Sequence, residues 1–545
     1  MSNVNIVSGR SKIATTLGIV AASQPLAARA GVQMLERGGH AVDAAIAANA
    51  VTGLVEPEMN GIGGDLFAMV YDASSGQVHG LNSGGWAPSA LTPAVIRAKG
   101  HAQMPDQGID SVTVPGAVAG WAALSARFGR LPLADVVAPA IHYAERGFPL
   151  SDIIAERWAG WTPKLAAEPE VAATYLPGGR APRAGELFKN HRLAKSLERI
   201  ARSGRDGFYR GETADSIIAL SQARGGTLTS ADLHEYQPEW VQPLSTTYHG
   251  CKVYELPPNT QGIAALLMLN LMEQFPLREY GCISASALHV MIEAKKLAYA
   301  DMITHVGDPR FGVAPLAEML DKSHAQARAR LIDAKAAAGS VEPSVLAGLT
   351  TSKGGDTIYL SAIDRHGNIV SLIQSIYYAF GSGLSPEGSG FMLHNRGALF
   401  TLDENHPNAL APRKRPLHTI IPGFMEIGPV KIGFGIMGGF NQAQAHAQFV
   451  SNVVDHGLDI QQALEAPRFT KKTFEGCDVE IEVGVPEPVR AELTALGHEL
   501  QVQPARTGAF GSGQAVMSDG SGVHFGASEP RHDGAAIPEA PQVFG

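Results

Sequence analysis

The stretch GGDTIYLSAIDRHGNIVSLIQS, residues 354–375, decides how the rest of the sequence is interpreted. Residues 357–364 and 368–380 are rich in β-branched and aromatic side chains, and a short Arg-His-Gly turn separates them, so they predict a hairpin of core strands. Residues 334–356 lose helical periodicity and gather Gly, Ser, Thr and Pro, which is typical of an exposed, mobile connection. Thr357 therefore stands where an exposed connection meets a buried strand.

Two interpretations of Thr357 follow. A β-branched residue commonly opens a strand, and this is the ordinary structural explanation. The alternative is catalytic: a threonine hydroxyl is a weak nucleophile unless a base lies beside it, and a threonine at the start of a chain has its own α-amine as that base. Such a role requires a cut between Asp356 and Thr357. An exposed connection before the cut and a rigid strand after it is the arrangement that this step needs.

The composition indicates a globular protein that acts on small molecules. The chain has 545 residues, of which 45% are hydrophobic and 17% charged. Its 43 Lys and Arg residues against 52 Asp and Glu residues give a formal charge of -9 without a long basic block, which disfavours nucleic acid or an anionic membrane as a partner. Apolar runs are too short to span a membrane, and the first residues have no continuous apolar core of the signal-peptide kind. We therefore expect a cytoplasmic protein.

Neither a metal nor a cofactor is expected from the sequence. Cys251, Cys282 and Cys477 are odd in number and far apart, and the 19 histidines include no H-E-x-x-H motif. The run GFGIMG at 433–438 fits the glycine pattern of a dinucleotide site, but the residues after it predict two helices rather than a second parallel strand.

Periodicity indicates how the chain is organised. Residues 23–55 predict two Ala-rich helices separated by Gly38 and Gly39, and residues 65–84 predict a strand, a turn and a second strand. Helical periodicity dominates from about residue 112 to residue 333, and a long helix is expected within 441–457.

Six segments resemble the γ-glutamyltranspeptidase family of N-terminal-nucleophile hydrolases, and together they extend over nearly the whole chain. They are residues 38–67, 114–148, 207–217, 296–311, 457–469 and 528–536. The family's nucleophile motif is a threonine, a strand that ends in aspartate, and a Gly-Asn turn. Thr357, Asp364, Gly367 and Asn368 align with this motif.

The resemblance implies a fold and a processing event. The expected fold is α+β, a four-layer αββα sandwich with two stacked sheets between helices. The expected proenzyme cleaves itself between Asp356 and Thr357 into a large chain, residues 1–356, and a small chain, residues 357–545. Both would remain in one αββα unit as a heterodimer, or as a dimer of heterodimers.

The resemblance also implies two parts of the catalytic machinery. Ser375 stands at the position of a second hydroxyl that hydrogen-bonds the nucleophile, and its ordinary alternative is a polar strand residue. Gly438 and Gly439 match the pair whose backbone N–H groups stabilise the oxyanion, since glycine lets a backbone donor approach where a side chain would collide. Their alternative is a turn that packs a helix closely on a strand.

The substrate pocket departs from the family pattern. The arginine that holds the α-carboxylate of a γ-glutamyl group is replaced by Gly84, and the aspartate that holds its α-ammonium by Leu399. The family's paired serines become His418 and Thr419, and its substrate-binding asparagine becomes Tyr377. The pattern is closest to the branch that includes oxamate amidohydrolase.

The sequence therefore predicts an amidohydrolase for a small amide that carries a carboxylate and no γ-glutamyl head. Arg396 and His418 are the cationic or potentially cationic groups at matched pocket positions. The candidate substrate-binding residues are Tyr377, Asn395, Arg396, His418 and Thr419. A salt bridge in solvent is the ordinary role for Arg396, and a core histidine for His418. Three alternatives stay open: a glutathione or γ-glutamyl hydrolase or transferase, a cephalosporin acylase for glutaryl-like groups, and an unprocessed, non-catalytic binding protein.

Overall fold

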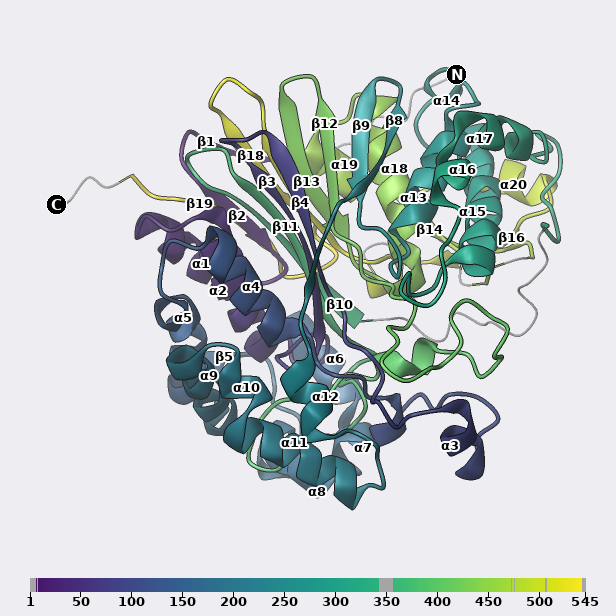
Figure 1. The fold of residues 1–545 in the computed structure, drawn as a ribbon. Helices are drawn as coiled ribbons and strands as arrows, with labels where there is room; N and C mark the ends of the chain where they lie inside the picture. The colour runs from purple at the N-terminus through teal and green to yellow at the C-terminus, as the bar shows by residue number, and fades with distance from the viewer. Residues whose placement is uncertain are drawn as a thin grey trace.

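Two seven-stranded sheets lie face to face at the centre of the structure (Figure 1). The computed structural model describes residues 6, 8–342, 356–471, 473–474, 476–504 and 507–541. The first sheet has the order β19 (Ala535–Pro538), β2 (Ile19–Ala22), β10 (Asp356–Ile363), β11 (Ile369–Tyr377), β3 (Asp65–Asp72), β4 (Gln77–Ser83) and β7 (Glu239–Val241). The second has the order β1 (Ile13–Thr15), β18 (His524–Ser528), β17 (Gly513–Ser518), β13 (Val430–Ile436), β12 (Gly423–Ile427), β9 (Cys251–Glu255) and β8 (Leu244–Tyr248). Neighbouring strands in both sheets are antiparallel.

Helices cover the outer face of each sheet (Figure 1). The helices on the side of the first sheet are α1 (Pro25–Glu36), α2 (Ala41–Val55), α4 (Ala117–Phe128), α5 (Leu133–Arg146) and α9 (His191–Ser203). Those on the side of the second are α13 (Gly262–Met272), α15 (Ala285–His305), α18 (Gln442–Val454) and α19 (Ile460–Glu465). The other helices are α3 (Pro93–Ala98), α6 (Asp152–Gly160), α7 (Thr162–Ala166), α8 (Pro169–Tyr175), α10 (Asp206–Tyr209), α11 (Gly211–Ala223), α12 (Ser230–Glu235), α14 (Leu277–Tyr280), α16 (Leu316–Leu320), α17 (Lys322–Ala329) and α20 (Glu487–Ala495). Short strands β5 (Phe148–Pro149) and β6 (Leu187–Phe188) pair with each other, and β14 (Phe469–Thr470), β15 (Asp478–Glu482) and β16 (Glu499–Gln503) form a small third sheet.

Three buried apolar layers hold the four structural layers together. Ile46 and Leu360 belong to the layer between the helices and the first sheet, and Tyr359 and Phe424 to the layer between the two sheets. A third cluster, which includes Leu266, lies between the second sheet and its helices. The order helix, sheet, sheet, helix confirms the predicted αββα sandwich.

The first two helices and the hairpin after them follow the sequence pattern. Helix α1 has a proline in its first turn and a side-chain cap from Gln24, and α2 begins with a capping box between His40 and Asp43. Gly38, with φ of 81°, lies between the two helices. Strands β3 and β4 pair from Leu66 opposite Ser83 to Asp72 opposite Gln77, as predicted.

The range expected to be mainly helical, residues 112–333, also contains β7, β8 and β9. Strands β8 and β9 are five residues each and form a hairpin on the second sheet. Strands this short give a weak alternating pattern between long helical segments, so helical periodicity hides them. The long helix expected within 441–457 is α18.

The decisive hairpin is formed by β10 and β11 as predicted. The carboxylate of Asp364 accepts hydrogen bonds from the backbone N–H groups of His366 and Asn368 and from the Asn368 side chain, which closes the turn. Gly367 has φ of 84°, in the region that favours glycine. Residues 343–355, most of the connection expected before Thr357, lie outside the described residues.

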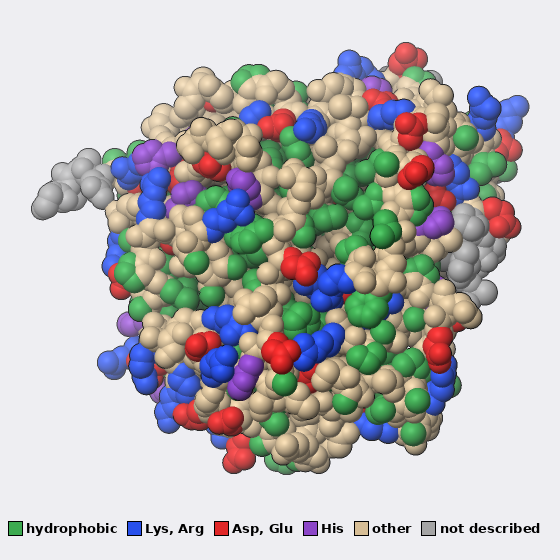
Figure 2. All heavy atoms as spheres, in the orientation of Figure 1, with side chains coloured by type: hydrophobic (Ala, Val, Ile, Leu, Met, Phe, Trp, Pro, Cys, Tyr) green, Lys and Arg blue, Asp and Glu red, His purple; other side chains and the backbone are tan. Residues whose placement is uncertain are grey.

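In the described part of the chain, no helix combines the length and apolar character needed to cross a membrane. On the face shown in Figure 2, acidic and basic side chains are interspersed rather than gathered into one basic surface.

Candidate active site

Two hydroxyls meet at the ends of β10 and β11. Thr357 Oγ1 donates a hydrogen bond of 3.2 Å to Ser375 Oγ, and both side chains are buried. The backbone N–H of Tyr377 donates to the same Ser375 oxygen at 2.8 Å. This hydrogen bond joins the Thr357 hydroxyl to Ser375, and the catalytic roles of the two residues stay predictions.

Tyr377 adopts an uncommon backbone conformation directly after the hydroxyl pair. Its φ is 77°, which is strained for a residue with a side chain. The bend directs its N–H to Ser375 and places its ring 4.4 Å from the guanidinium carbon of Arg396. The ring also stacks on Tyr378, with 4.1 Å between the ring centres. Tyr377 thus links the hydroxyl pair to the predicted anion-binding residue.

Arg396 is fully buried and only partly hydrogen-bonded. Its Nη1 donates to Thr419 Oγ1 at 2.8 Å, whereas Nε and Nη2 have no acceptor among the described residues. Burial lowers the pKa of Arg396 to about 10, against the attraction of Asp65, so the side chain is still cationic at neutral pH. A buried guanidinium with unpaired N–H groups is costly unless a ligand supplies the acceptors.

Asp65 supplies the counter-charge but is occupied by the protein itself. Its Oδ1 accepts from Gly85 N at 2.9 Å, and its Oδ2 lies 3.0 Å from His418 Nε2 and 3.5 Å from His394 Nδ1. Burial alone would raise the pKa of Asp65, but the electrostatic influence of His394, the hydrogen bond from His418 and the charge of Arg396 outweigh it and lower the pKa to about 2. Asp65 is therefore an anion whose oxygens are engaged by neighbouring groups.

The hydrogen bonds assign a neutral state to His418. Its Nε2 donates to Asp65, and its Nδ1 accepts from the backbone N–H of Ile420 at 3.4 Å. Burial, and next the charge of Arg396, lower the pKa of His418 to about 3. His418 therefore orients Asp65, and the structure does not favour the cationic role that the sequence suggested for it.

The position of Gly84 is closed to a larger side chain. A Cβ atom at Gly84 would lie 2.9 Å from Phe67 Cζ and 3.4 Å from His418 Cδ2. The two rings pack edge to face, with 4.6 Å between their centres. An arginine could not extend from this position without displacing them.

Asn395 and Leu399 lie on either side of Arg396 in the sequence, and both are held by hydrogen bonds within the protein. The Asn395 side chain accepts from Tyr378 N at 3.0 Å and donates to Asp106 O at 2.6 Å, so it fixes the tyrosine pair. Leu399 is half-buried at the end of the short helix η3 (Arg396–Leu399). Its carbonyl oxygen accepts from the Asn408 side chain at 2.6 Å.

The strand that leads to the glycine pair packs on the two strands that carry the hydroxyl pair. A Cβ at Gly433 would lie 2.8 Å from the Ile369 side chain, and one at Gly435 would lie 2.4 Å from the Tyr359 ring. Gly438 and Gly439 follow the end of β13, and Thr357 lies at the start of β10. Gly438 has φ of 130° and Gly439 of 59°. Within the described residues, their N–H groups have no protein acceptor.

A sequence model described as gamma-glutamyltranspeptidase matches residues 27–539. The chain belongs to the γ-glutamyltranspeptidase family. The glutathione hydrolase-like YwrD proenzyme of Bacillus subtilis (strain 168) is 36% identical over 96% of this chain and 98% of its own length. The oxamate amidohydrolase proenzyme of Klebsiella pneumoniae is 31% identical over 96% and 98%. The crystal structure of a cephalosporin acylase from Bacillus halodurans is 41% identical, covers 97% of both chains and superposes with a TM-score of 0.91.

These relatives confirm the predicted family and class of reaction. As a γ-glutamyltranspeptidase-family protein, the chain is an amide hydrolase. The three relatives are named for different substrates, glutathione, oxamate and cephalosporins, so their names do not decide the acyl group.

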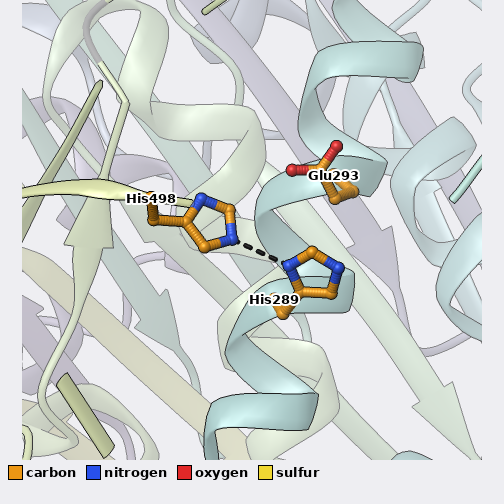
Figure 3. Close-up of side chains that lie close together, drawn as sticks. All are labelled: His289, Glu293 and His498. Carbon is orange, nitrogen blue, oxygen red and sulfur yellow. Dashed lines mark hydrogen bonds between the residues drawn. The ribbon is translucent and has the colours of Figure 1, made fainter. Parts of the chain in front are cut away.

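One cluster in this family member has the composition of a metal site. His289, Glu293 and His498 are buried, and one potential ligand atom of each lies within 4.8 Å of those of the other two (Figure 3). His289 Nδ1 and His498 Nε2 are 2.8 Å apart, and Glu293 Oε1 accepts from Lys296 Nζ at 2.7 Å. Each side chain thus has a partner in the protein, and the Lys296 ammonium occupies the carboxylate that a cation would need. The hydrogen bonds account for the cluster as a structural contact of α15.

Sequence reasoning missed Asp65, His394 and Gln261. Asp65 lies in a segment that resembles the family, but a single carboxylate at the start of a strand carries no pattern that distinguishes a role. In the sequence, Gln261 lies between two prolines and the apolar helix α13, and its side chain is buried. Its amide Nε2 donates to the backbone oxygens of Thr419 and Gly439. These three residues are far apart in the sequence, and only the folded chain brings them to the site.

Proposed function

We propose that this protein is an N-terminal-threonine amidohydrolase that cleaves itself between Asp356 and Thr357 and then hydrolyses a small amide whose acyl group carries a carboxylate. The observation that carries this proposal is Arg396. It is a buried cation whose nitrogens Nε and Nη2 have no acceptor in the described structure, and Tyr377 joins it to the Thr357–Ser375 pair. A carboxylate placed there would accept the hydrogen bonds that the protein leaves unmade.

The proposed reaction uses Thr357 twice. In the uncut chain its hydroxyl attacks the carbonyl carbon of Asp356, and the amide bond between Asp356 and Thr357 breaks, which leaves an ester on Oγ1 and frees the α-amine. Water then hydrolyses this ester to the Asp356 carboxylate and the free Thr357 hydroxyl, which cuts the chain. In the cut enzyme this amine takes the hydroxyl proton as Oγ1 attacks the substrate amide. The N–H groups of Gly438 and Gly439 stabilise the oxyanion, the leaving amine receives the proton, and water then hydrolyses the acyl-threonine ester.

The charges of the pocket set the substrate class. Arg396 offers donors only, and the oxygens of Asp65 already accept hydrogen bonds from the protein. The pocket thus matches an acyl group with acceptors and no ammonium. The α-ammonium of a γ-glutamyl group would lose its hydration without gaining a carboxylate partner from this set. Oxamate, whose acyl group is small, planar and anionic, meets the requirement.

A second candidate is a cephalosporin acylase for glutaryl-like side chains. The 41% identity to the Bacillus halodurans cephalosporin acylase over 97% of both chains favours it. A glutaryl group also ends in a carboxylate, so Arg396 would serve both substrates. The oxamate and glutaryl substrates differ in the distance between carboxylate and amide. The substrate that the enzyme hydrolyses faster would therefore show which distance the pocket fits.

The proposed cut would leave the two chains associated. Strands β2, β3, β4 and β7 come from the predicted large chain, whereas β11, β19 and nearly all of β10 come from the small chain, and all belong to one sheet. Separation would break strand pairs inside both sheets. We therefore propose a heterodimer of residues 1–356 and 357–545 that keeps the αββα unit.

Two measurements test the function. Denaturing electrophoresis should show two fragments, and Edman sequencing of the smaller should begin Thr-Ile-Tyr-Leu. The cut protein should then release ammonia from oxamate, with glutathione a poor substrate. A single uncut chain, or a small fragment with another first residue, would contradict the proposal.

A further inference from the structure

We propose that Gln261 is a positioning residue that sets the catalytic orientation of the glycine pair, an inference that rests on the proposed amidohydrolase function. Gln261 is fully buried at the start of α13. Its amide nitrogen Nε2 donates one hydrogen bond to Thr419 O and one of 2.8 Å to Gly439 O. One side chain thus connects Thr419, the hydrogen-bond partner of Arg396, to the Gly438–Gly439 turn.

The backbone of Gln261 strengthens the same connection. Its N–H donates to His418 O at 3.0 Å, and His418 N donates to Asn259 O at 2.7 Å. Residues 259–261 and 418–419 therefore lie along each other through backbone hydrogen bonds, and the Gln261 side chain extends from this contact to Gly439. The Tyr299 hydroxyl lies between Gln261 Oε1, at 3.3 Å, and Phe440 O, which fixes the amide from its other end.

The glycine turn needs this restraint because of its own freedom. Gly438 and Gly439 both have positive φ, and glycine has few steric barriers to other conformations. Gly439 O accepts one hydrogen bond from the Gln442 N–H within the turn and one from Gln261, and the bond from Gln261 holds the peptide that follows Gly439 against the rest of the protein. The N–H of Gly439 belongs to the preceding peptide, only two soft torsions away. A small rotation at this point would turn the N–H groups away from the oxyanion, and such donors act only when preorganised.

The opposite side of the turn has a separate brace. Asn441 Nδ2 donates to Phe510 O at 2.9 Å, and Arg468 Nη1 donates to Phe510 O and Gly511 O. A Cβ at Gly438 would lie 3.3 Å from Gly511 Cα, so residues 510–511 limit the turn from outside. Gln261 limits it from the pocket side, which is why its loss should change the turn's orientation without unfolding it.

The test replaces Gln261 by methionine, which keeps the length of the side chain and removes both donors. Gln448→Met is the matched control, because Gln448 is also buried and its Nε2 also donates to two backbone oxygens, those of Gln444 and Phe469. The oxyanion exists only in the transition state, so Gln261→Met should lower kcat on oxamate about 10- to 100-fold and leave KM within about twofold. Gln448→Met should leave both constants within about threefold of wild type.

A third variant provides a pH readout that a purely structural role would not give. In Gln261→Glu, a protonated side chain donates one hydrogen bond, whereas the carboxylate repels the two carbonyl oxygens. The ratio of kcat for Gln261→Glu to kcat for Gln261→Met should therefore fall as pH rises from 5 to 8.

The possible outcomes distinguish a failure of the role proposed for Gln261 from a failure of the proposed amidohydrolase function. A kcat loss confined to the Gln261 variants, with the falling ratio, supports the positioning role. An active wild type with unchanged kcat in Gln261→Met, or a loss of equal size in Gln448→Met, overturns the role of Gln261 alone. A correctly cut wild type that hydrolyses none of oxamate, glutaryl-cephalosporin and glutathione overturns the proposed function and this inference together.

Discussion

Two buried arginines, Arg396 and Arg468, differ in how far the protein itself satisfies their hydrogen-bond donors. Burial lowers the pKa of both to about 10. Arg468 donates to the carboxylate of Glu529 and to the backbone oxygens of Leu464, Phe510 and Gly511. Arg396 donates to Thr419 alone, and its Nε and Nη2 have no acceptor in the described structure.

The difference separates two kinds of buried charge. A guanidinium whose donors are met by the protein stabilises a particular packing, and here it fixes the 510–511 segment behind the glycine turn. A buried guanidinium whose N–H groups have no acceptors lowers the stability of the fold unless a ligand supplies those acceptors. Arg415 also has unpaired nitrogens, but it forms an ion pair of 2.7 Å with Glu239. No carboxylate of the described residues makes such a pair with Arg396.

The largest expected effect is the loss of self-cleavage and amide hydrolysis when Thr357, the proposed nucleophile, is replaced. Thr357→Ala removes the hydroxyl that attacks both the chain and the substrate, so we expect one uncut chain and no amide hydrolysis. Thr357→Ser, which keeps a hydroxyl, should still cut. Denaturing electrophoresis and ammonia release measure both effects. A processed, active Thr357→Ala protein would show that another residue is the nucleophile.

The next largest effect is a loss of stability when Arg468, whose donors have acceptors in the protein, is replaced. Arg468→Met leaves Glu529 with one fewer partner in a buried site, and removing one member of a buried ion pair typically costs about 3 to 5 kcal/mol. Urea unfolding should show this loss in the free energy of unfolding. A change below about 1 kcal/mol would mean that the Arg468 network contributes little to the fold.

Arg396→Met should have a much smaller effect on stability. It removes a buried charge that forms no direct ion pair in the described structure, but it also removes the attraction between Arg396 and Asp65, so the free energy of unfolding should change by less than about 1 kcal/mol. The same urea titration compares it directly with Arg468→Met. A loss as large as that of Arg468→Met would show that Arg396 is structural and would remove the contrast.

The smallest effect is a pH dependence from the histidine cluster. Burial, and next the proximity of His289, lower the pKa of His498 from 6.5 to about 3, so the folded chain keeps His498 neutral where the unfolded chain takes up a proton. Its contribution to stability is thus present above pH 6.5 and declines as pH falls toward 3, by about 1 kcal/mol per pH unit. Urea titrations at pH 7, 6 and 5 should show a shallower decline for His498→Leu. Equal slopes would contradict this.

Local pattern was sufficient for much of the fold. The Ala-rich pair α1 and α2, the β3–β4 hairpin and the β10–β11 hairpin each carry their own periodicity and turn residues. The short strands β8 and β9 were missed because five residues between long helices give too few alternations to outweigh the surrounding helical period.

The site was only partly accessible from sequence, for a physical reason. Thr357 and Ser375 lie on one hairpin, so the motif that predicts the hairpin also pairs them. Asp65, Gln261, Arg396 and His418 come from distant segments, and their protonation depends on burial that no local pattern encodes. His418 illustrates the limit: its residue type suggested a cation, whereas burial and the charge of Arg396 favour a neutral side chain that donates to Asp65.

The central claim is that Arg396 holds the carboxylate of the substrate beside Thr357. The most direct test measures kcat/KM for oxamate and for oxamide, its neutral isostere, in wild type and Arg396→Met. Truncating a buried, hydrogen-bonded partner of a charge costs about 2 to 5 kcal/mol, so wild type should prefer oxamate by about 30-fold or more, and Arg396→Met should lose that preference while still cutting itself. An unchanged preference for oxamate in Arg396→Met, or wild-type hydrolysis of glutathione faster than of oxamate, would contradict the claim.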